Sequence, residues 1–128
     1  MASITPSLAA LPLIEDELDL LGELVPLDGR DIVELGCGNA RLARALLERH
    51  PDSRFTGLEV DERQHAKNLA SPQAGLRFVA AGAQSVPFPD ASFDLALMLK
   101  SLHHVPRELM ARALRESARV LRSVPRQP

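Results

Sequence analysis

Two glycines and two glutamates stand out as the residues whose spacing could do chemistry. Gly36 and Gly38 follow the short apolar run 31–35, Glu34 lies inside that run, and Glu59 follows Gly38 by 21 positions. Glycines allow positive φ and a close approach of a ligand to the backbone. A carboxylate at the end of the next strand can accept both ribose hydroxyls of a nucleoside. The pattern predicts a nucleoside-binding turn, although the two glycines alone would equally fit an ordinary strand-to-helix turn.

The same residues distinguish between classes of nucleotide. A dinucleotide-binding turn carries a third glycine where this sequence has Arg41. The two phosphates of a dinucleotide would also face the like charge of Glu34, so a nicotinamide-dependent oxidoreductase is the less favoured interpretation. The sequence has no Gly-Lys-Ser or Gly-Lys-Thr, which excludes a Walker-type phosphate loop. S-adenosylmethionine (SAM) has an adenosine and a cationic amino group, and it suits Glu34 better.

Short apolar runs that alternate with helical segments must position these residues. We expect strands at 31–35, 55–60, 76–80 and 93–99, and helices at 11–25, 40–50, 61–69 and after Pro106. This alternation predicts βαβ units with right-handed crossovers. The expected fold class is therefore α/β, a Rossmann-like doubly wound parallel sheet.

Finer expectations concern the helices and the longest loop. Asn39 is a plausible N-cap for the second helix, and the segment 81–92 reads as a long loop. Glu116 and Arg119 have the spacing of an ion pair on the outer face of the last helix. Helical spacing predicts a buried stripe in the first and last helices, made respectively of Ile14, Leu18, Leu21 and Val25 and of Met110, Leu114, Ala118 and Leu121.

Composition excludes several classes of protein. The 128 residues suit one domain, 1–128, with the N-terminal helix at 11–25, a ligand-binding core at 30–121 and an irregular tail at 122–128. A net charge of −2, no Trp or Tyr and only 4 Phe argue against a nucleic-acid partner. The longest apolar run is too short to span a membrane. We therefore expect no membrane association, no metal site and, with a single Cys, a cytoplasmic location.

Four segments in a fixed order resemble the class I SAM-dependent methyltransferases, in particular those that act on small molecules. The segments are VELGCGNAR, FTGLEVDE, FVAAGAQSVPFPDASFDLAL and SLHHVP, the last followed by a helix ending in ARVLR. The resemblance implies SAM as cofactor and a small-molecule methyl acceptor. It also implies a set of cofactor-binding residues: Glu34, Gly36 and Gly38 at the methionine end, Glu59 at the ribose, and Val60, Gly82, Ala83 and Leu99 around the adenine and the remaining cofactor surface.

The resemblance also has departures at this site. The family's turn often has a third glycine where this chain has Ala40, and an Asp that accepts from the adenine amino group is replaced by Gly82. Gln84 is a candidate to compensate for that lost contact.

The sequence offers candidates for catalytic residues, each with a structural alternative. Three residues that follow the expected fourth strand are candidates for binding the acceptor or accepting its proton, namely Lys100, His103 and His104. The alternative is that the two histidines pack against the loop or cap a helix and that Lys100 is solvated. Cys37 has no identifiable base and is better explained by the turn's need for a small residue. Asp94, at the entry of the fourth strand, is expected to be structural.

The sequence ends after the fourth expected strand, where family members continue. We therefore expect a partial fold with strand order 3-2-1-4, truncated at the C-terminus relative to the family. The strand at 93–99 would then have an exposed apolar edge through which the chain could self-associate. A second hypothesis follows from this: a SAM-binding or interaction module without transfer activity.

Overall fold

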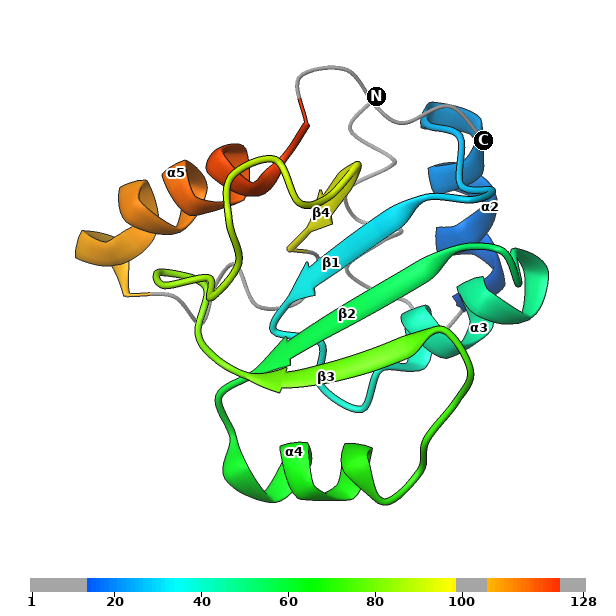
Figure 1. Cartoon of the computed structure of the whole chain (residues 1–128), viewed down its shortest axis with the longest axis horizontal. Helices are drawn as coiled ribbons and strands as arrows, with labels where there is room; N and C mark the ends of the chain where they lie inside the picture. Colours follow the sequence, from blue (N-terminus) through cyan, green and yellow to red (C-terminus); the bar gives the residue numbers. More distant parts are fainter. Residues whose placement is uncertain (1–13, 99–105, 123–128) are drawn as a thin grey trace.

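The four strands of the molecule form one parallel sheet in the order β3-β2-β1-β4. The structure is a computed structural model and describes residues 14–98 and 106–122. The predicted fold class and strand order are confirmed (Figure 1). The strands are β1 (Asp31–Leu35), β2 (Arg54–Glu59), β3 (Leu76–Ala80) and β4 (Leu95–Leu97).

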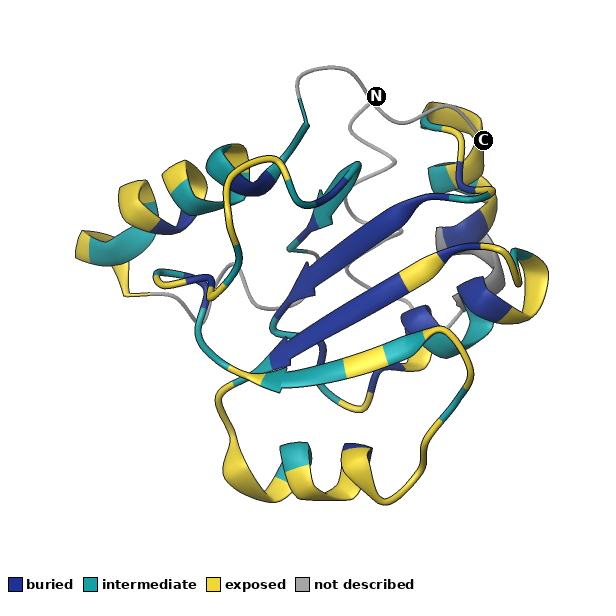
Figure 2. Ribbon diagram, in the orientation of Figure 1, coloured by how far each residue is buried: buried dark blue, intermediate teal, exposed yellow. Residues whose placement is uncertain are grey.

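Helices cover both faces of this sheet. One face packs against α2 (Ile14–Leu24) and α3 (Arg41–Arg49). The other face packs against α5 (Met110–Val120), which follows the short 3-10 helix η2 (Arg107–Leu109). Helix α4 (Glu62–Leu69) contacts β2 and β3 and lies beside the β3 edge of the sheet (Figure 1). Figure 2 shows that β1 is buried along its whole length, as expected for a central parallel strand.

The amphipathic pattern of the first helix is confirmed where its side chains are described. Leu18 is buried, and Leu21 and Val25 pack against the same core cluster. That cluster also contains Ile32, Phe55 and the apolar face of α3. Burial of this stripe, rather than helix propensity, is what stabilises so short a helix.

The predicted stripe of the last helix is wrong. Leu114 is 54% exposed, and Ala113 and Val120 are the residues that α5 buries against the sheet. The helix is rotated because Glu116 and Arg119 turn inward to bind the loop 81–92, as described below. Polar contacts therefore decide which face of α5 is covered.

Strand β4 is shorter than the predicted 93–99, and Phe93, just before it, is paired with the segment that follows α5. Phe93 forms an isolated parallel bridge with Leu121, and the Arg122 N–H donates to the Phe93 carbonyl at 2.8 Å. The end of α5 thus begins to pair beside β4. The self-association expected at this edge stays a prediction.

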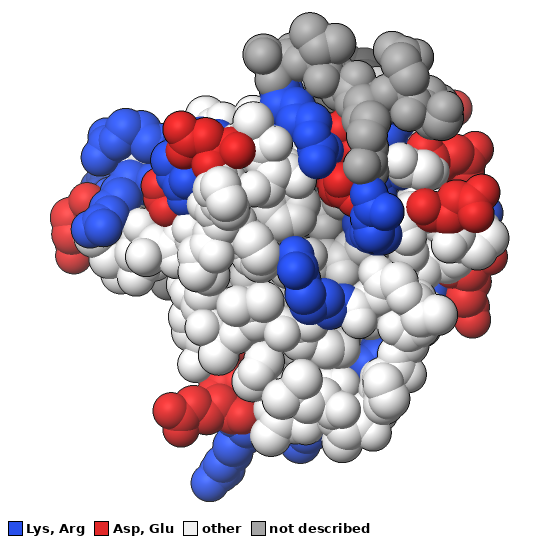
Figure 3. Space-filling model, in the orientation of Figure 1, with Lys and Arg blue, Asp and Glu red and all other residues white. Residues whose placement is uncertain are grey.

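Three further observations concern membrane-spanning helices, surface charge and metal-binding groups. None of the described helices is long and apolar enough to cross a membrane. Figure 3 shows acidic and basic side chains mixed around the rim of the visible face, with a largely uncharged area between them that contains a basic side chain near its centre. Within the described ranges, no group of three or more His, Cys, Asp or Glu residues could hold a metal ion.

Candidate functional site

The turn between β1 and α3 is fixed by backbone hydrogen bonds to the neighbouring strand. The N–H groups of Gly36 and Cys37 both donate to the Leu58 carbonyl, at 2.9 and 2.8 Å. Gly36 and Gly38 have φ values of 78° and 58°, a region that L side chains rarely adopt. The two glycines therefore let the chain reverse direction directly above the carboxyl end of the sheet.

The start of α3 differs from the prediction. Ala40, not Asn39, occupies the N-cap position, with φ 63° and no side-chain cap. Asn39 instead accepts a hydrogen bond from the Arg41 N–H at 3.2 Å. Ala40 thus adopts a left-handed backbone conformation that favours glycine.

Glu59 links the beginnings of two helices at the end of β2. Its Oε1 accepts from the Gly38 N–H at 2.8 Å, and its Oε2 accepts from the Asp61 N–H at 3.1 Å. A carboxylate oxygen has two lone-pair positions, so each oxygen can accept one further donor. Two adjacent acceptors of this kind match the vicinal hydroxyls of a ribose.

Glu34 is a buried carboxylate beside the same turn. It is 2% exposed and lines a cleft with about 320 Å³ of empty space, open to solvent. Gly36, Gly38 and Arg41 also line this cleft. The carboxylate of Glu34 thus gives one wall of the cleft an acidic group.

Helix α4 supports the turn from the side through a residue that the sequence did not single out. Asn68 is 2% exposed, and its Nδ2 donates to the Gly38 carbonyl at 2.8 Å. Gln64, one turn earlier, donates to Asn68 Oδ1 at 2.9 Å and fixes the orientation of the amide. An Asn at the inner position of a mostly polar helix was the only signal for this role.

Cys37 is buried, in keeping with the structural role expected for it. Burial, followed by the charges of Glu34 and Glu59, raises the pKa of its thiol to about 12. Its side chain lies on β2, so a Cβ at Gly57 would approach Sγ to 2.7 Å. Gly57 is therefore the residue that makes room for the turn.

The loop 81–92 carries the other side of the site and is held by two residues of α5. Glu116 accepts from the Val86 N–H at 2.8 Å, and Arg119 donates to the Val86 and Phe88 carbonyls, both at 2.8 Å. Arg119 also binds Glu116 at 2.8 Å and Asp90 at 2.9 Å. The predicted Glu116–Arg119 pair is confirmed, but it faces the loop and not the outside. Its hydrogen bonds lower the pKa of Glu116, the contact with Arg119 contributing most.

The start of this loop lies beside the end of β2. The Ala81 N–H donates to the Glu59 carbonyl at 3.3 Å. Ala83 is 7% exposed in the core cluster of the α5 face, whereas Val60 is 67% exposed. The structure thus brings together seven of the expected cofactor residues in two neighbouring groups: Glu34, Gly36, Gly38 and Glu59 around the turn, and Val60, Gly82 and Ala83 at the loop.

The remaining predicted residues cannot be placed in the same way. Leu99, Lys100, His103 and His104 lie outside the described residues. The expectations of a cofactor contact for Leu99 and of catalytic roles for the other three therefore stay predictions.

An ionic network occupies the amino edge of the sheet, which is where β1 and β4 begin. Asp94 Oδ2 accepts from the Asp31 N–H at 2.8 Å, and Arg122 binds both carboxylates, at 2.9 Å for Asp94 and 3.0 Å for Asp31. Arg54 adds a contact of 2.6 Å to Asp31. Asp94 is therefore structural, in agreement with the sequence.

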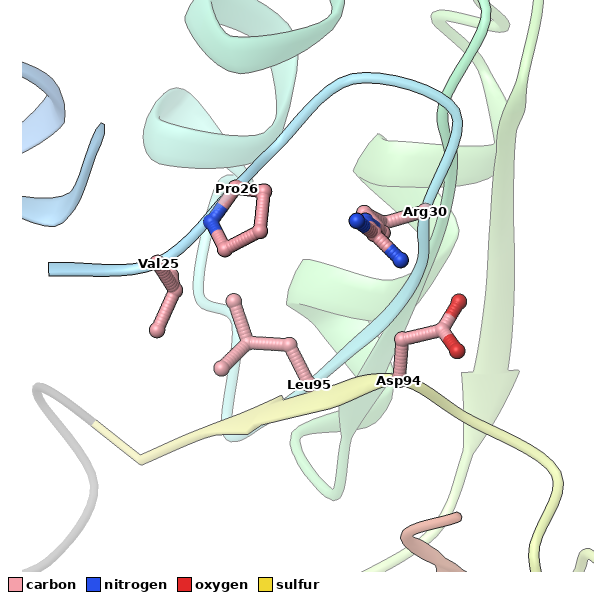
Figure 4. A pocket seen from close by; sticks show the side chains of 5 residues that line it. All are labelled: Val25, Pro26, Arg30, Asp94 and Leu95. Atoms are coloured by element: carbon pink, nitrogen blue, oxygen red, sulfur yellow. The ribbon is translucent and has the colours of Figure 1, made fainter. Parts of the chain in front are cut away.

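A small pocket also opens at that edge, with about 310 Å³ of empty space. Figure 4 shows Arg30 and Asp94 at one end of it and three apolar residues at the other, namely Val25, Pro26 and Leu95. Because it lies at the amino ends of β1 and β4, it is separate from the glycine turn.

Comparisons with known proteins agree with this geometry. Residues 32–123 match the family model of a methyltransferase domain. The chain is 34% identical to the 27-O-demethylrifamycin SV methyltransferase of Amycolatopsis mediterranei over 110 residues, which is 81% of this chain and 39% of that protein. It therefore spans well under half the length of this curated relative.

Two solved structures extend the comparison. A SAM-dependent methyltransferase from Mesorhizobium loti has a TM-score of 0.70 at 30% identity, and the match covers 91% of this chain and 51% of that one. The cyclase SpnF has a TM-score of 0.71 at 31% identity, with 81% and 39% covered. From the matched family model and the shared sheet, we conclude that the chain belongs to the class I SAM-dependent methyltransferase family.

Proposed function

We propose that this chain binds SAM at the carboxyl edge of its sheet and serves methyl transfer to a small-molecule acceptor. The observation that carries the proposal is the position of Glu59. Its two oxygens accept from Gly38 and Asp61 N–H groups and keep one lone-pair position each for the ribose hydroxyls. Val60, exposed and next to Glu59, offers an apolar surface for the adenine.

The residues at the turn fit the other end of the same cofactor. The buried carboxylate of Glu34 lines the cleft and would bind the ammonium group of the methionine portion. Gly36 and Gly38 let that portion approach the backbone. A bound dinucleotide would instead place phosphates near Glu34, which disfavours a nicotinamide-dependent oxidoreductase.

The cofactor supplies an activated methyl group on its sulfonium. The protein then has to align the acceptor with the S–CH₃ bond and exclude water. His103 or His104 would accept the acceptor's proton, and Lys100 would bind a carboxylate, in keeping with their place after β4 in the sequence. The rifamycin methyltransferase among the relatives supports a small-molecule acceptor.

A second candidate function is a SAM-binding or interaction module without methyl transfer. The match to SpnF supports this alternative, because SpnF has the same fold but is named for a cyclase reaction and not for methyl transfer. The chain spans 39% of the length of its curated relative. Labelled-methyl transfer from SAM to a metabolite pool separates the two candidates.

The binding proposal is tested by calorimetric titration with S-adenosylhomocysteine and with NAD. We expect binding of the first and not of the second. Glu59→Gln removes one acceptor position and the charge, so affinity for S-adenosylhomocysteine should fall about 10-fold to 100-fold. Glu62→Gln, on the exposed face of α4, is the matched control and should bind like the wild type. Tight NAD binding without a response to S-adenosylhomocysteine would refute the proposal.

A further inference from the structure

The side chain of Gln84 fills the space in front of Gly82. A Cβ built on Gly82 would lie 3.1 Å from Gln84 Oε1, 3.4 Å from Gln84 Cδ and 3.1 Å from Val60 Cγ1. These distances are tighter than normal contacts, so a side chain at position 82 would push Gln84 or Val60 away. The absence of a side chain at Gly82 is therefore what lets the Gln84 carboxamide lie beside Val60.

This carboxamide is half-buried and available. Among the described residues, no hydrogen bond joins it to another protein group. Partly buried polar groups usually have partners, and an amide offers one acceptor and two donor hydrogens. The apolar side chain next to it, Val60, is 67% exposed. Together they form a surface with an apolar part and a polar edge, which suits a planar heterocyclic base.

The loop that carries Gln84 is held in place from the other side. Val86, two residues later, is 4% exposed and is bound through both its N–H and its carbonyl by Glu116 and Arg119. Ala83, directly before Gln84, is buried in the core. The backbone on both sides of Gln84 is thus anchored, so its side chain is presented to the site from a fixed position.

We propose that Gln84 is the side chain that contacts the polar edge of the cofactor's base in this chain. Its Oε1 accepts a hydrogen bond from the amino group of adenine while the ring lies on Val60. The inference rests on the proposed cofactor. Because a carboxamide can rotate to present its NH₂ group, Gln84 can also donate to a base that carries an oxo group at the same position. The wild-type chain should therefore discriminate only weakly between adenine and hypoxanthine.

The experiment compares S-adenosylhomocysteine with S-inosylhomocysteine, in which an oxo group replaces the amino group. Calorimetry should give dissociation constants for the two ligands within about 5-fold of each other in the wild type. Gln84→Ala should weaken both by about 3-fold to 10-fold, the loss of one hydrogen bond. Gln84→Glu has only acceptors at neutral pH. It should retain S-adenosylhomocysteine and weaken the inosyl ligand by about 10-fold or more.

Ser85→Ala, at the exposed neighbouring position, is the matched control and should leave both affinities unchanged. Circular dichroism melting of each variant establishes that it is folded before titration. If both Gln84 variants bind the two ligands as the wild type does, the inference is wrong while the cofactor proposal stands. If the wild type fails to bind S-adenosylhomocysteine, the proposed function fails and the inference fails with it.

Discussion

The two edges of the sheet both hold acidic side chains but use them differently. At the amino edge, Asp31 and Asp94 are bound by guanidinium groups, with Arg122 contacting both at 3.0 and 2.9 Å. At the carboxyl edge, Glu59 accepts from two backbone N–H groups at 2.8 and 3.1 Å. The charges of the first edge are neutralised by arginines, whereas each oxygen of Glu59 accepts from a backbone N–H and keeps a further acceptor position.

This difference suggests that the amino edge serves the stability of the fold and the carboxyl edge serves ligand binding. An ion pair whose members are largely buried destabilises the fold when one partner is removed, because the other charge stays behind. A carboxylate that accepts from backbone N–H groups keeps further acceptor positions, which a ligand can occupy. We therefore expect variants at the amino edge to change the free energy of unfolding, and variants at the carboxyl edge to change cofactor affinity.

The largest effect is expected at the amino edge. Asp94→Ala removes the acceptor of the Asp31 N–H and one partner of Arg122, and should lower the free energy of unfolding by about 3 kcal/mol. Urea denaturation measures this loss, with the exposed Asp52→Ala as control. Affinity for S-adenosylhomocysteine at a temperature where the variant is folded should stay within about 2-fold of the wild type. A large loss of affinity in the folded variant would show that the two edges are coupled.

A smaller effect is expected where the glycine turn crosses β2. Gly57→Ala places a methyl group 2.7 Å from the Cys37 Sγ, so the turn must shift. Overpacking of this kind should cost about 2 kcal/mol of stability and also weaken ligand binding.

The double variant Gly57→Ala/Cys37→Ala tests that explanation by removing the sulfur. It should recover a large part of both losses. Equal stability and affinity of the single and double variants would mean that Cys37 is not the group that Gly57 accommodates.

The smallest effect concerns the pH dependence contributed by Cys37. Its pKa is raised from 9.0 to about 12 by burial first and then by Glu34 and Glu59. The folded state holds its proton more tightly than the unfolded state. The resulting stability is present below pH 9 and is lost as pH rises from 9 toward 12.

Urea denaturation of wild type and Cys37→Ser at a series of pH values measures this contribution. Relative to the variant, the wild type should have lost about 1 kcal/mol at pH 10 compared with pH 8. Iodoacetamide should also modify the folded thiol slowly at pH 8. Rapid modification of the folded protein would contradict the raised pKa.

Periodicity and the family resemblance together predicted the sheet. The alternation of apolar runs and helices predicted a parallel α/β sheet, and the resemblance to the methyltransferases supplied the order β3-β2-β1-β4. The predicted strand 76–80 agrees with β3 at both ends. The spacing of Gly38 and Glu59 predicted that both lie at one nucleoside-binding turn, and the structure joins them by a hydrogen bond of 2.8 Å that was not predicted. These features depend on local patterns of apolar residues and on the short connection between β1 and β2, and a single sequence reveals both.

Contacts between segments far apart in the sequence could not be predicted from such patterns. The stripe in α5 was predicted from apolar spacing, but Glu116 and Arg119 bind the loop 81–92 and rotate the helix. Asn68 supports Gly38 across 30 positions, and the placement of Gln84 depends on the space left by Gly82. Each of these depends on tertiary packing, for which a single sequence has no periodic signal.

The bridge that Glu59 forms between Gly38 and Asp61 has a spectroscopic consequence. Both amide protons point at the same carboxylate, so a hydroxyl that binds to either oxygen changes the electron density felt by both. In a nitrogen–proton correlation spectrum, the Gly38 and Asp61 signals should move together along one titration curve. The chain thus contains a pair of natural reporter nuclei for the proposed ribose site, with no label beyond uniform nitrogen-15.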